Sequence, residues 1–192
     1  MNINEEEIRA KHKVIIAKGI KLSKQVKDKG HSYEHLTDVI DNMIDIIEGL
    51  PDNTKINTEV CIVSAYWHDA GRTMTNNGYE KYSADLLSSE LKKEGYDKSF
   101  IKACYDAIIH HRWNMMPTTL EGHVLKDADK IALIGVERWK SCINHKHRID
   151  STLKLLSILR NDILYFDISK KIYDEKVVDL IQLLYNYIFI EK

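Results

Sequence analysis

The sequence predicts an all-α protein that folds as a single domain over residues 1–192. Apolar residues make up 44% of the chain, which is enough to fill the core of one domain of this length. Only two prolines and eight glycines interrupt the chain, so long helices are favoured over a turn-rich β-sandwich. Apolar residues recur at helical spacing in segment after segment, and no segment shows the alternation of a half-buried strand.

Two helices are expected at the N-terminal end. The first begins at Asn4, which can form a capping box with Glu7, and it ends before Gly30. The second begins near Ser32, carries apolar residues three and four positions apart, and is stopped by Pro51.

Three helices are expected in the middle of the chain. The segment from about residue 58 to residue 67 is almost wholly apolar, so this helix should be buried. The polar stretch 72–78 indicates a loop. Helices over about residues 79–94 and 97–111 follow, and Asp97 is placed to cap the second of them.

The C-terminal part begins at a break marked by Pro117. Thr118 and Glu121 are spaced as a capping box and predict a helix that continues to about Ile134. The remaining segment, residues 141–192, also shows helical spacing and is expected to pack on the rest of the domain.

Charge and cysteine content exclude several classes of protein. The 28 Lys and Arg residues nearly balance the 29 Asp and Glu residues, so no nucleic-acid partner is expected. No apolar run approaches the roughly 18–20 residues of a membrane span, and the acidic N-terminal segment is unlike a signal peptide, so we expect a cytoplasmic protein with no membrane contact. The cysteines are widely spaced and odd in number, which predicts reduced thiols and no thiolate metal site: Cys61, Cys104 and Cys142.

A His-Asp dipeptide, His68-Asp69, stands at the end of the apolar helix 58–67. A charged pair in such a place costs free energy unless it is solvated, paired or bound to a metal. Imidazole and carboxylate together suit a divalent ion such as Mn²⁺, Zn²⁺, Co²⁺ or Fe²⁺. When the dipeptide is considered alone, a capping or surface pair is the favoured explanation, so its companions decide the interpretation.

Further ligand-type residues lie on other predicted helices. His31 and His35 are four positions apart and share one face at the start of the second helix. Asp127 and Asp129 lie in a segment that otherwise indicates a buried helix, although a salt bridge with Lys130 would also explain Asp129.

Four short stretches occur in a fixed order. They are GHSYEHL at 30–36, AYWHDAGR at 65–72, IIHH at 108–111 and LKDADKI at 125–131. Together they resemble the HD superfamily of metal-dependent phosphohydrolases. The resemblance implies an all-α bundle with a motif-bearing core at about residues 28–140. It also implies one divalent cation (Mn, Co, Zn, Fe or Mg) on four ligands: His31, His68, Asp69 and Asp129.

Two details refine what the resemblance implies. Asp129, rather than Asp127, matches the metal-binding aspartate of the family, because it directly precedes the basic residue and the apolar run. Asp127 is then expected beside the site or on the surface. Family members with two metals use a further histidine in the helix after the His-Asp pair, and residues 79–84 contain none, so a single-metal site is favoured.

The expected reaction follows from the number of ligands. Four protein ligands on an ion that accepts six leave positions for water and a phosphate oxygen, and the metal lowers the pKa of its water from ~15.7 toward neutrality. Arg72 is expected to clamp a phosphate group. Candidates for phosphate contact or leaving-group protonation are His35, Lys130, His110 and His111, although each has a purely structural alternative.

Other readings stay open at this point. Residues 31–35 fit the H-x-x-E-H string of a class of metallopeptidases, but that string leaves His68, Asp69 and Asp129 unexplained. A catalytically inactive nucleotide-binding or regulatory module is the third reading. The expected partner is a small phosphorylated molecule such as a nucleotide, and the oligomeric state is left open. A solvated basic turn is favoured over a metal site for His145 and His147.

Overall fold

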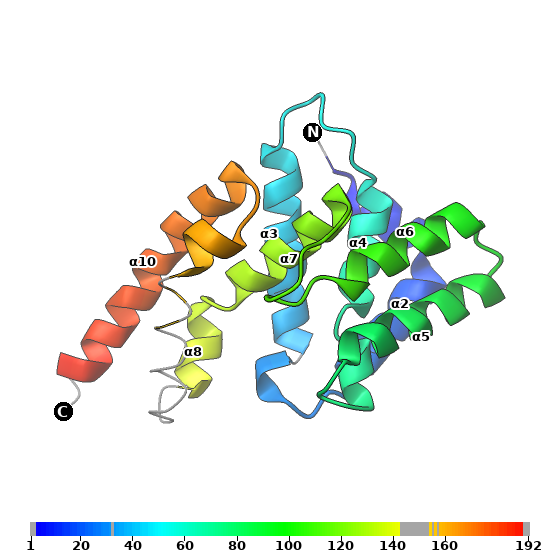
Figure 1. The fold of residues 1–192 in the computed structure, drawn as a ribbon. Helices are drawn as coiled ribbons and strands as arrows, with labels where there is room; N and C mark the ends of the chain where they lie inside the picture. The colour runs from blue at the N-terminus through cyan, green and yellow to red at the C-terminus, as the bar shows by residue number, and fades with distance from the viewer. Residues whose placement is uncertain (1–2, 32, 143–153, 155, 157, 190–192) are drawn as a thin grey trace.

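The computed structural model describes residues 3–31, 33–142, 154, 156 and 158–189, and these residues form helices with no strand among them (Figure 1). The all-α prediction is therefore confirmed. The α-helices are α1 (Glu5–Lys11), α2 (Lys13–Ser23), α3 (Tyr33–Gly49), α4 (Thr58–Trp67), α5 (Tyr79–Lys93), α6 (Lys98–Ile109), α7 (Leu120–Ala132), α8 (Val136–Cys142) and α10 (Asp167–Phe189). Short helical turns are η1 (Lys29–His31), η2 (Ala70–Thr73) and η3 (Leu159–Ile163).

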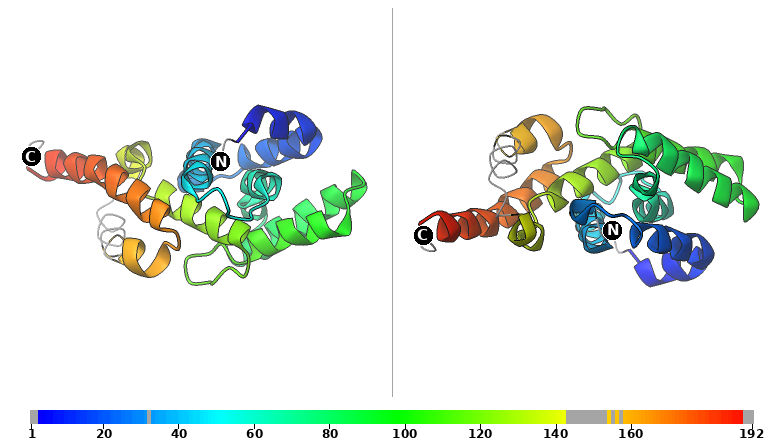
Figure 2. Two further views of the ribbon diagram at one scale, coloured as in Figure 1. Left: turned by 90° about the horizontal axis from the view of Figure 1, so that it is seen from above. Right: turned by 90° about the horizontal axis from the view of Figure 1, so that it is seen from below.

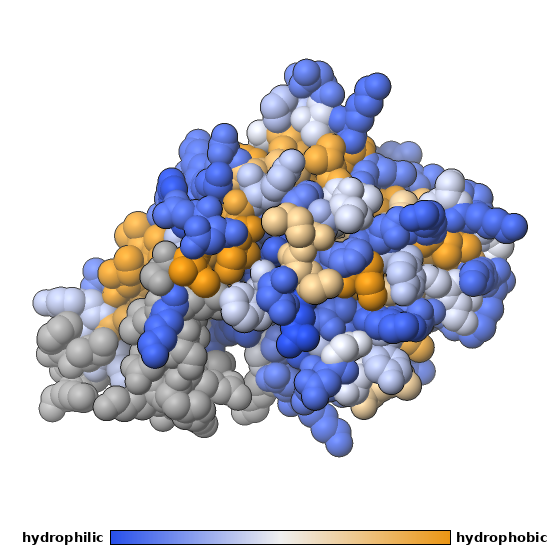
Figure 3. All heavy atoms as spheres, viewed as in Figure 1, coloured by the Kyte–Doolittle hydropathy of each residue, from blue (hydrophilic) through white to orange (hydrophobic). Residues whose placement is uncertain are grey.

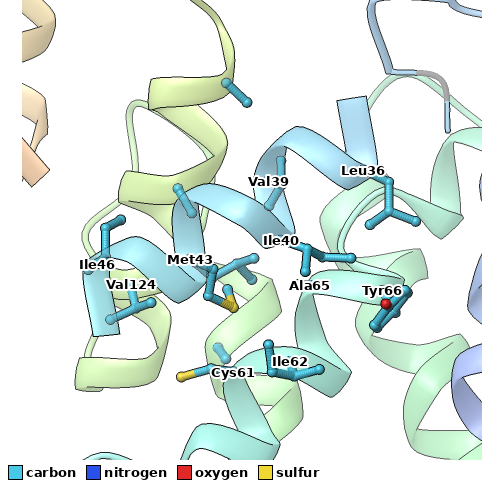
Figure 4. Close-up of a cluster of buried hydrophobic side chains, with 14 of the residues drawn as sticks. Leu36, Val39, Ile40, Met43, Ile46, Cys61, Ile62, Ala65, Tyr66 and Val124 are labelled. Carbon is cyan, nitrogen blue, oxygen red and sulfur yellow. The ribbon is translucent and has the colours of Figure 1, made fainter. Parts of the chain in front are cut away.

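The centre of the core lies where α3, α4 and α7 pack against one another. Figure 4 shows side chains from all three helices in this cluster, including Val39, Met43, Ile62 and Val124, and all four are fully buried. Burial of one such side chain contributes about 1.5–3 kcal/mol to folding. Helices α5 and α6 form an antiparallel pair against α4, and α2 also packs on α4. Helix α4 is thus enclosed, as its apolar sequence predicted.

The N-terminal segment forms two helices where the sequence predicted one. Asn4 caps α1 by accepting a hydrogen bond from the Glu7 N–H, as expected. The helix then breaks at His12, whose ring is buried. Its two ring nitrogens lie 2.8 Å from the Tyr96 hydroxyl and 3.1 Å from a Glu59 oxygen. These contacts to α4 and to the loop between α5 and α6 hold the ring at the break, and helical spacing within residues 4–27 carries no sign of them.

The cap of α7 also differs from the expected one. Thr119, not Thr118, is the N-cap and accepts a hydrogen bond from the Gly122 N–H at 3.1 Å. Glu121 does not close a capping box, because its carboxylate accepts a hydrogen bond from the Asn57 N–H at 2.9 Å. A long-range contact to the residue that caps α4 has therefore replaced a local one.

The C-terminal helix α10 packs on α3 and α7 and then reaches away from the other helices (Figure 2). Leu180 and Leu184 face the core, whereas Val178, Ile181 and Tyr185 are exposed. On the face drawn in Figure 3, hydrophobic residues lie over part of α10, and others lie in the centre of the face and on its right side. Within the described part of the chain, no helix combines the length and the apolar character needed to cross a bilayer.

Candidate metal centre

Three helices deliver ligand-type side chains to one buried point. His35 lies in the first turn of α3, His68 directly follows α4, and Asp129 lies in α7. One ligand atom from each lies within 4.8 Å of those of the other two, and all three side chains are buried. We call these residues the His35–His68–Asp129 group. Because α3, α4 and α7 also build the core, the core packing holds the group in place.

The turn after α4 shapes one side of the group. The His68 ring donates from Nδ1 to the Ala65 carbonyl at 2.7 Å, which fixes the ring and leaves the Nε2 lone pair available as a ligand. Gly71 allows the turn to lie close to α5, since a Cβ there would come within 2.2 Å of the Tyr79 carbonyl oxygen. Its N–H donates to the Ser83 hydroxyl at 2.8 Å. The glycine of the AYWHDAGR stretch is thus required for packing.

Asp69 completes the donor set. Its Oδ2 lies 3.5 Å from His68 Nε2 and 3.8 Å from His35 Nε2. These three atoms are all buried and have no hydrogen-bond partner. A buried polar atom without a partner costs about 1–3 kcal/mol. One cation of the kind that accepts imidazole and carboxylate ligands would satisfy all three, so these residues fit a divalent metal ion.

The charges in the site also suit a cation. Burial raises the pKa of the Asp129 carboxyl, but the neighbouring Lys130 ammonium and the His35 ring outweigh it and hold that pKa well below the ordinary value. The pKa of Asp69 is likewise low, since His68, His31 and Arg72 outweigh the effect of its burial. Burial lowers the pKa of His35 to about 4, so its ring is neutral at neutral pH. The two carboxylates and the neutral His35 ring are in the protonation states that metal binding requires. Burial lowers the pKa of His68, but Asp69 and Asp129 outweigh it and raise that pKa, so a cation would compete with a proton at this ring.

His31, the first ligand expected from the sequence, is not part of the group. It lies in η1, before α3 begins, and its Nδ1 donates to Asp28 Oδ2 at 3.0 Å. The two ring centroids of His31 and His35 are 5.5 Å apart, so His31 lies beside the group. The sequence did contain a sign that His35 points inward. Residues four positions apart share one face of a helix, and Val39, four residues after His35, belongs to the buried face of α3.

A cavity of about 530 Å³ adjoins the group. Positively charged residues contribute strongly to its lining, and no carboxylate side chain lines it among the described residues. Such a cavity suits an anionic ligand. The lining residues are His31, Arg72, Asn76, Tyr79, Arg112, Trp113, Lys130, Leu133, Lys154 and Ile158.

Arg72 and Lys130 connect the cavity with the acidic residues. The Arg72 Nε donates to Asp69 Oδ1 at 2.8 Å, and the Lys130 ammonium bonds to Asp129 Oδ2. The Arg72 guanidinium also lies 3.6 Å from the centroid of the Tyr79 ring, a close cation–π contact. Of the residues that the sequence nominated for phosphate contact, Arg72 and Lys130 therefore line the cavity beside the candidate metal ligands.

His110 and His111 do not line this cavity. His111 is buried, and its Nδ1 donates to the Ile108 carbonyl at 2.6 Å, so its Nε2 accepts from the Tyr79 hydroxyl at 3.4 Å. Burial lowers the pKa of His111 to about 4, which keeps the ring neutral. His111 therefore helps to position the Tyr79 side chain through this hydrogen bond. His110 follows α6 directly, and its buried Nδ1 has no hydrogen-bond partner.

Asp127 has a structural task that its sequence position did not reveal. It is buried on α7 and accepts hydrogen bonds from the N–H groups of Tyr165 and Phe166 at 3.0 Å. It thereby ties the turn before α10 to α7. The segment that contains His145 and His147 lies outside the described residues.

Comparison with known proteins gives two matches. The family model of the HD domain matches residues 32–134, a range that includes His35, His68, Asp69 and Asp129 but begins after His31. The chain is also similar to the crystal structure of a predicted HD superfamily hydrolase from an uncultured Thermotogales bacterium, with 22% identity and a TM-score of 0.70. That similarity covers 97% of this chain and 98% of the other. No curated protein matches.

Proposed function

The chain belongs to the HD domain family, and from this premise we propose that it is a metal-dependent phosphohydrolase. Its substrate is a phosphate ester or anhydride of a nucleotide or another small phosphorylated metabolite. The observation that carries the proposal is the convergence of the His35–His68–Asp129 group and Asp69 beside a cationic cavity. The description of the similar crystal structure as a hydrolase agrees with this class of activity.

The proposed ligands are His35, His68, Asp69 and Asp129, with His35 in place of the His31 that the sequence suggested. A divalent cation bound there supplies an acidified water molecule and polarises a phosphoryl oxygen. The choice of His35 follows from its buried Nε2, which faces Asp129 Oδ1 at 3.1 Å. His31 already donates to Asp28 and borders the cavity instead.

The remaining residues would bind and orient the phosphate group. Arg72 has its Nε fixed by Asp69 and its guanidinium plane held against Tyr79, so the cation is positioned before the substrate arrives. Lys130 brings a second positive charge to the same side of the cavity. His110, which the sequence nominated as a proton donor to the leaving group, does not line the cavity and is given no contact with the substrate.

The metallopeptidase reading has less support than the phosphohydrolase reading. The H-x-x-E-H string needs Glu34 to act as a base beside both histidines. Glu34 is exposed, and His31 lies outside the buried group. The string therefore does not converge on a buried centre.

A phosphate-release screen tests the proposal. Chelator-treated protein would be supplied in turn with Mn²⁺, Co²⁺, Mg²⁺ and Zn²⁺ and assayed against nucleotides and sugar phosphates. We expect release that depends on the metal and is lost in His35→Ala, together with the bound metal. His31→Ala is the matched control for metal content, since it removes the same side chain four residues earlier and should keep one equivalent. Release of no phosphate under any of the four metals would refute the proposal.

A further inference from the structure

Trp113 differs from the other two tryptophans of the chain. Trp67 and Trp139 are buried, and their indole N–H groups donate to the carbonyls of Ile15 and Leu133 at 3.1 and 3.0 Å. Trp113 lies in the loop between α6 and α7, is 49% exposed and lines the cavity. A large aromatic surface is thus open to solvent inside the cavity beside the candidate metal centre.

Other apolar residues line the same cavity. Leu133 comes directly after α7, and Ile158 comes directly before η3, so the apolar lining is assembled from three separate segments of the chain. Leu133 lies three residues beyond Lys130, which is about one helical turn, or roughly 5 Å, along α7. The apolar lining therefore begins about one turn away from the charge that contacts Asp129.

The cavity is also larger than a phosphate group needs. Its volume of about 530 Å³ falls in the range of roughly 300–1,000 Å³ that is typical of sites for whole small molecules. Its lining combines cations with an aromatic ring and aliphatic side chains, and a substrate that matches this lining has an anionic part and a flat apolar part.

We propose that Trp113, with Leu133 and Ile158, forms a subsite for a planar aromatic group joined to the scissile phosphate. The substrate class is then a phosphate of an aromatic-bearing alcohol, and a nucleoside phosphate combines these parts. Trp113 is the residue that determines this specificity, through stacking of the ring on its indole. This inference rests on the proposed phosphohydrolase activity and adds the part of the substrate that does not react.

A pair of substrates isolates the aromatic group. A nucleoside 5′-monophosphate and ribose 5-phosphate carry the same phosphate ester on the same sugar, and only the first carries a base. Stacking of one base on an aromatic side chain corresponds to about 5- to 160-fold in affinity. We expect the metal-loaded protein to prefer the nucleotide in kcat/KM by a factor in that range, for at least one of the four common bases.

Variants at two positions of one loop complete the test. Trp113→Ala should lower kcat/KM for the nucleotide to near the value for ribose 5-phosphate, whereas Trp113→Phe should keep most of the preference. Met116→Ala is the matched control, because Met116 is exposed on the same loop and does not line the cavity. It should change neither value. Equal rates on both substrates, or an unchanged preference in Trp113→Ala, would overturn the subsite.

A binding measurement separates failure of the subsite from failure of the proposed function. Nucleoside monophosphate should quench the tryptophan fluorescence of chelator-treated protein, and Trp113→Phe should abolish the quenching while Met116→Ala preserves it. Absence of phosphate release from both substrates, with quenching intact, would refute the phosphohydrolase and retain the subsite. Release without Trp113-dependent quenching or preference would retain the phosphohydrolase and refute the subsite.

Discussion

Removal of the metal should destabilise the fold by an amount that the structure allows to be estimated. The donor set contains three buried atoms without a hydrogen-bond partner, on His35, His68 and Asp69. A cation that binds only the folded state, at 100 times its dissociation constant, stabilises that state by about 2.7 kcal/mol. For a domain of about 150–250 residues, each kcal/mol corresponds to about 2–4 °C in Tm. Mn²⁺ should therefore raise the Tm of chelator-treated protein by about 5–11 °C.

The assay is thermal unfolding of each variant with chelator and with excess Mn²⁺. Comparing the two conditions within one variant cancels the effect of the substitution on the metal-free fold. His31→Ala should keep the full Tm increase, whereas His35→Ala and Asp129→Ala should lose most of it. An increase that survives in His35→Ala but disappears in His31→Ala would refute the proposed ligand set. An increase of less than about 1 °C in the unmodified protein would refute the site itself.

Three further predictions concern residues around the centre. Tyr79→Leu removes the ring that contacts the Arg72 guanidinium, so about 2 kcal/mol of cation–π energy is lost. This loss should lower kcat/KM in a steady-state assay by about 30-fold. Tyr79→Phe keeps the ring, and its kcat/KM should stay within a few-fold of the original value. Burial raises the pKa of Asp127 to about 6, so ionisation of this carboxyl lowers the free energy of unfolding as the pH rises from about 4 through 6. In urea denaturation, the free energy of unfolding of Asp127→Asn should therefore rise relative to that of the original protein over this pH range. A difference between the two proteins that stays constant with pH would count against the raised pKa. His110→Ala should keep its metal and leave kcat within a few-fold of the original enzyme, because His110 does not line the cavity, whereas a loss of roughly 10²–10⁴-fold would identify His110 as the proton donor.

Local signals in the sequence were sufficient for most of the fold. Apolar spacing and caps placed the helices, and the apolar character of residues 58–67 predicted the enclosed position of α4. The break at His12 and the cap at Thr119 were missed, because contacts from distant residues decide both. Such contacts leave no trace in the spacing of a single segment.

Local signals in the sequence also predicted part of the candidate site, and the residues decided by helix ends and loop positions were missed. Asp129 was distinguished from Asp127 by its neighbours in the sequence, and the structure places Asp129 at the centre while Asp127 holds the turn before α10. The choice between His31 and His35 depended on where α3 begins, and a shift of a few residues at a helix end decides which ring points inward. The lining of the cavity by Trp113 could be seen only once the loops were placed.

Anomalous diffraction from crystals grown with Mn²⁺ tests the proposed centre most directly. The proposed ligand set predicts one strong peak about 2.0–2.3 Å from His35 Nε2, His68 Nε2 and a carboxylate oxygen of Asp129, distances typical of such ligands. It also predicts a carboxylate oxygen of Asp69 in the same coordination shell. A peak bound by His31 in place of His35, or no peak among these side chains at saturating Mn²⁺, would contradict the proposal.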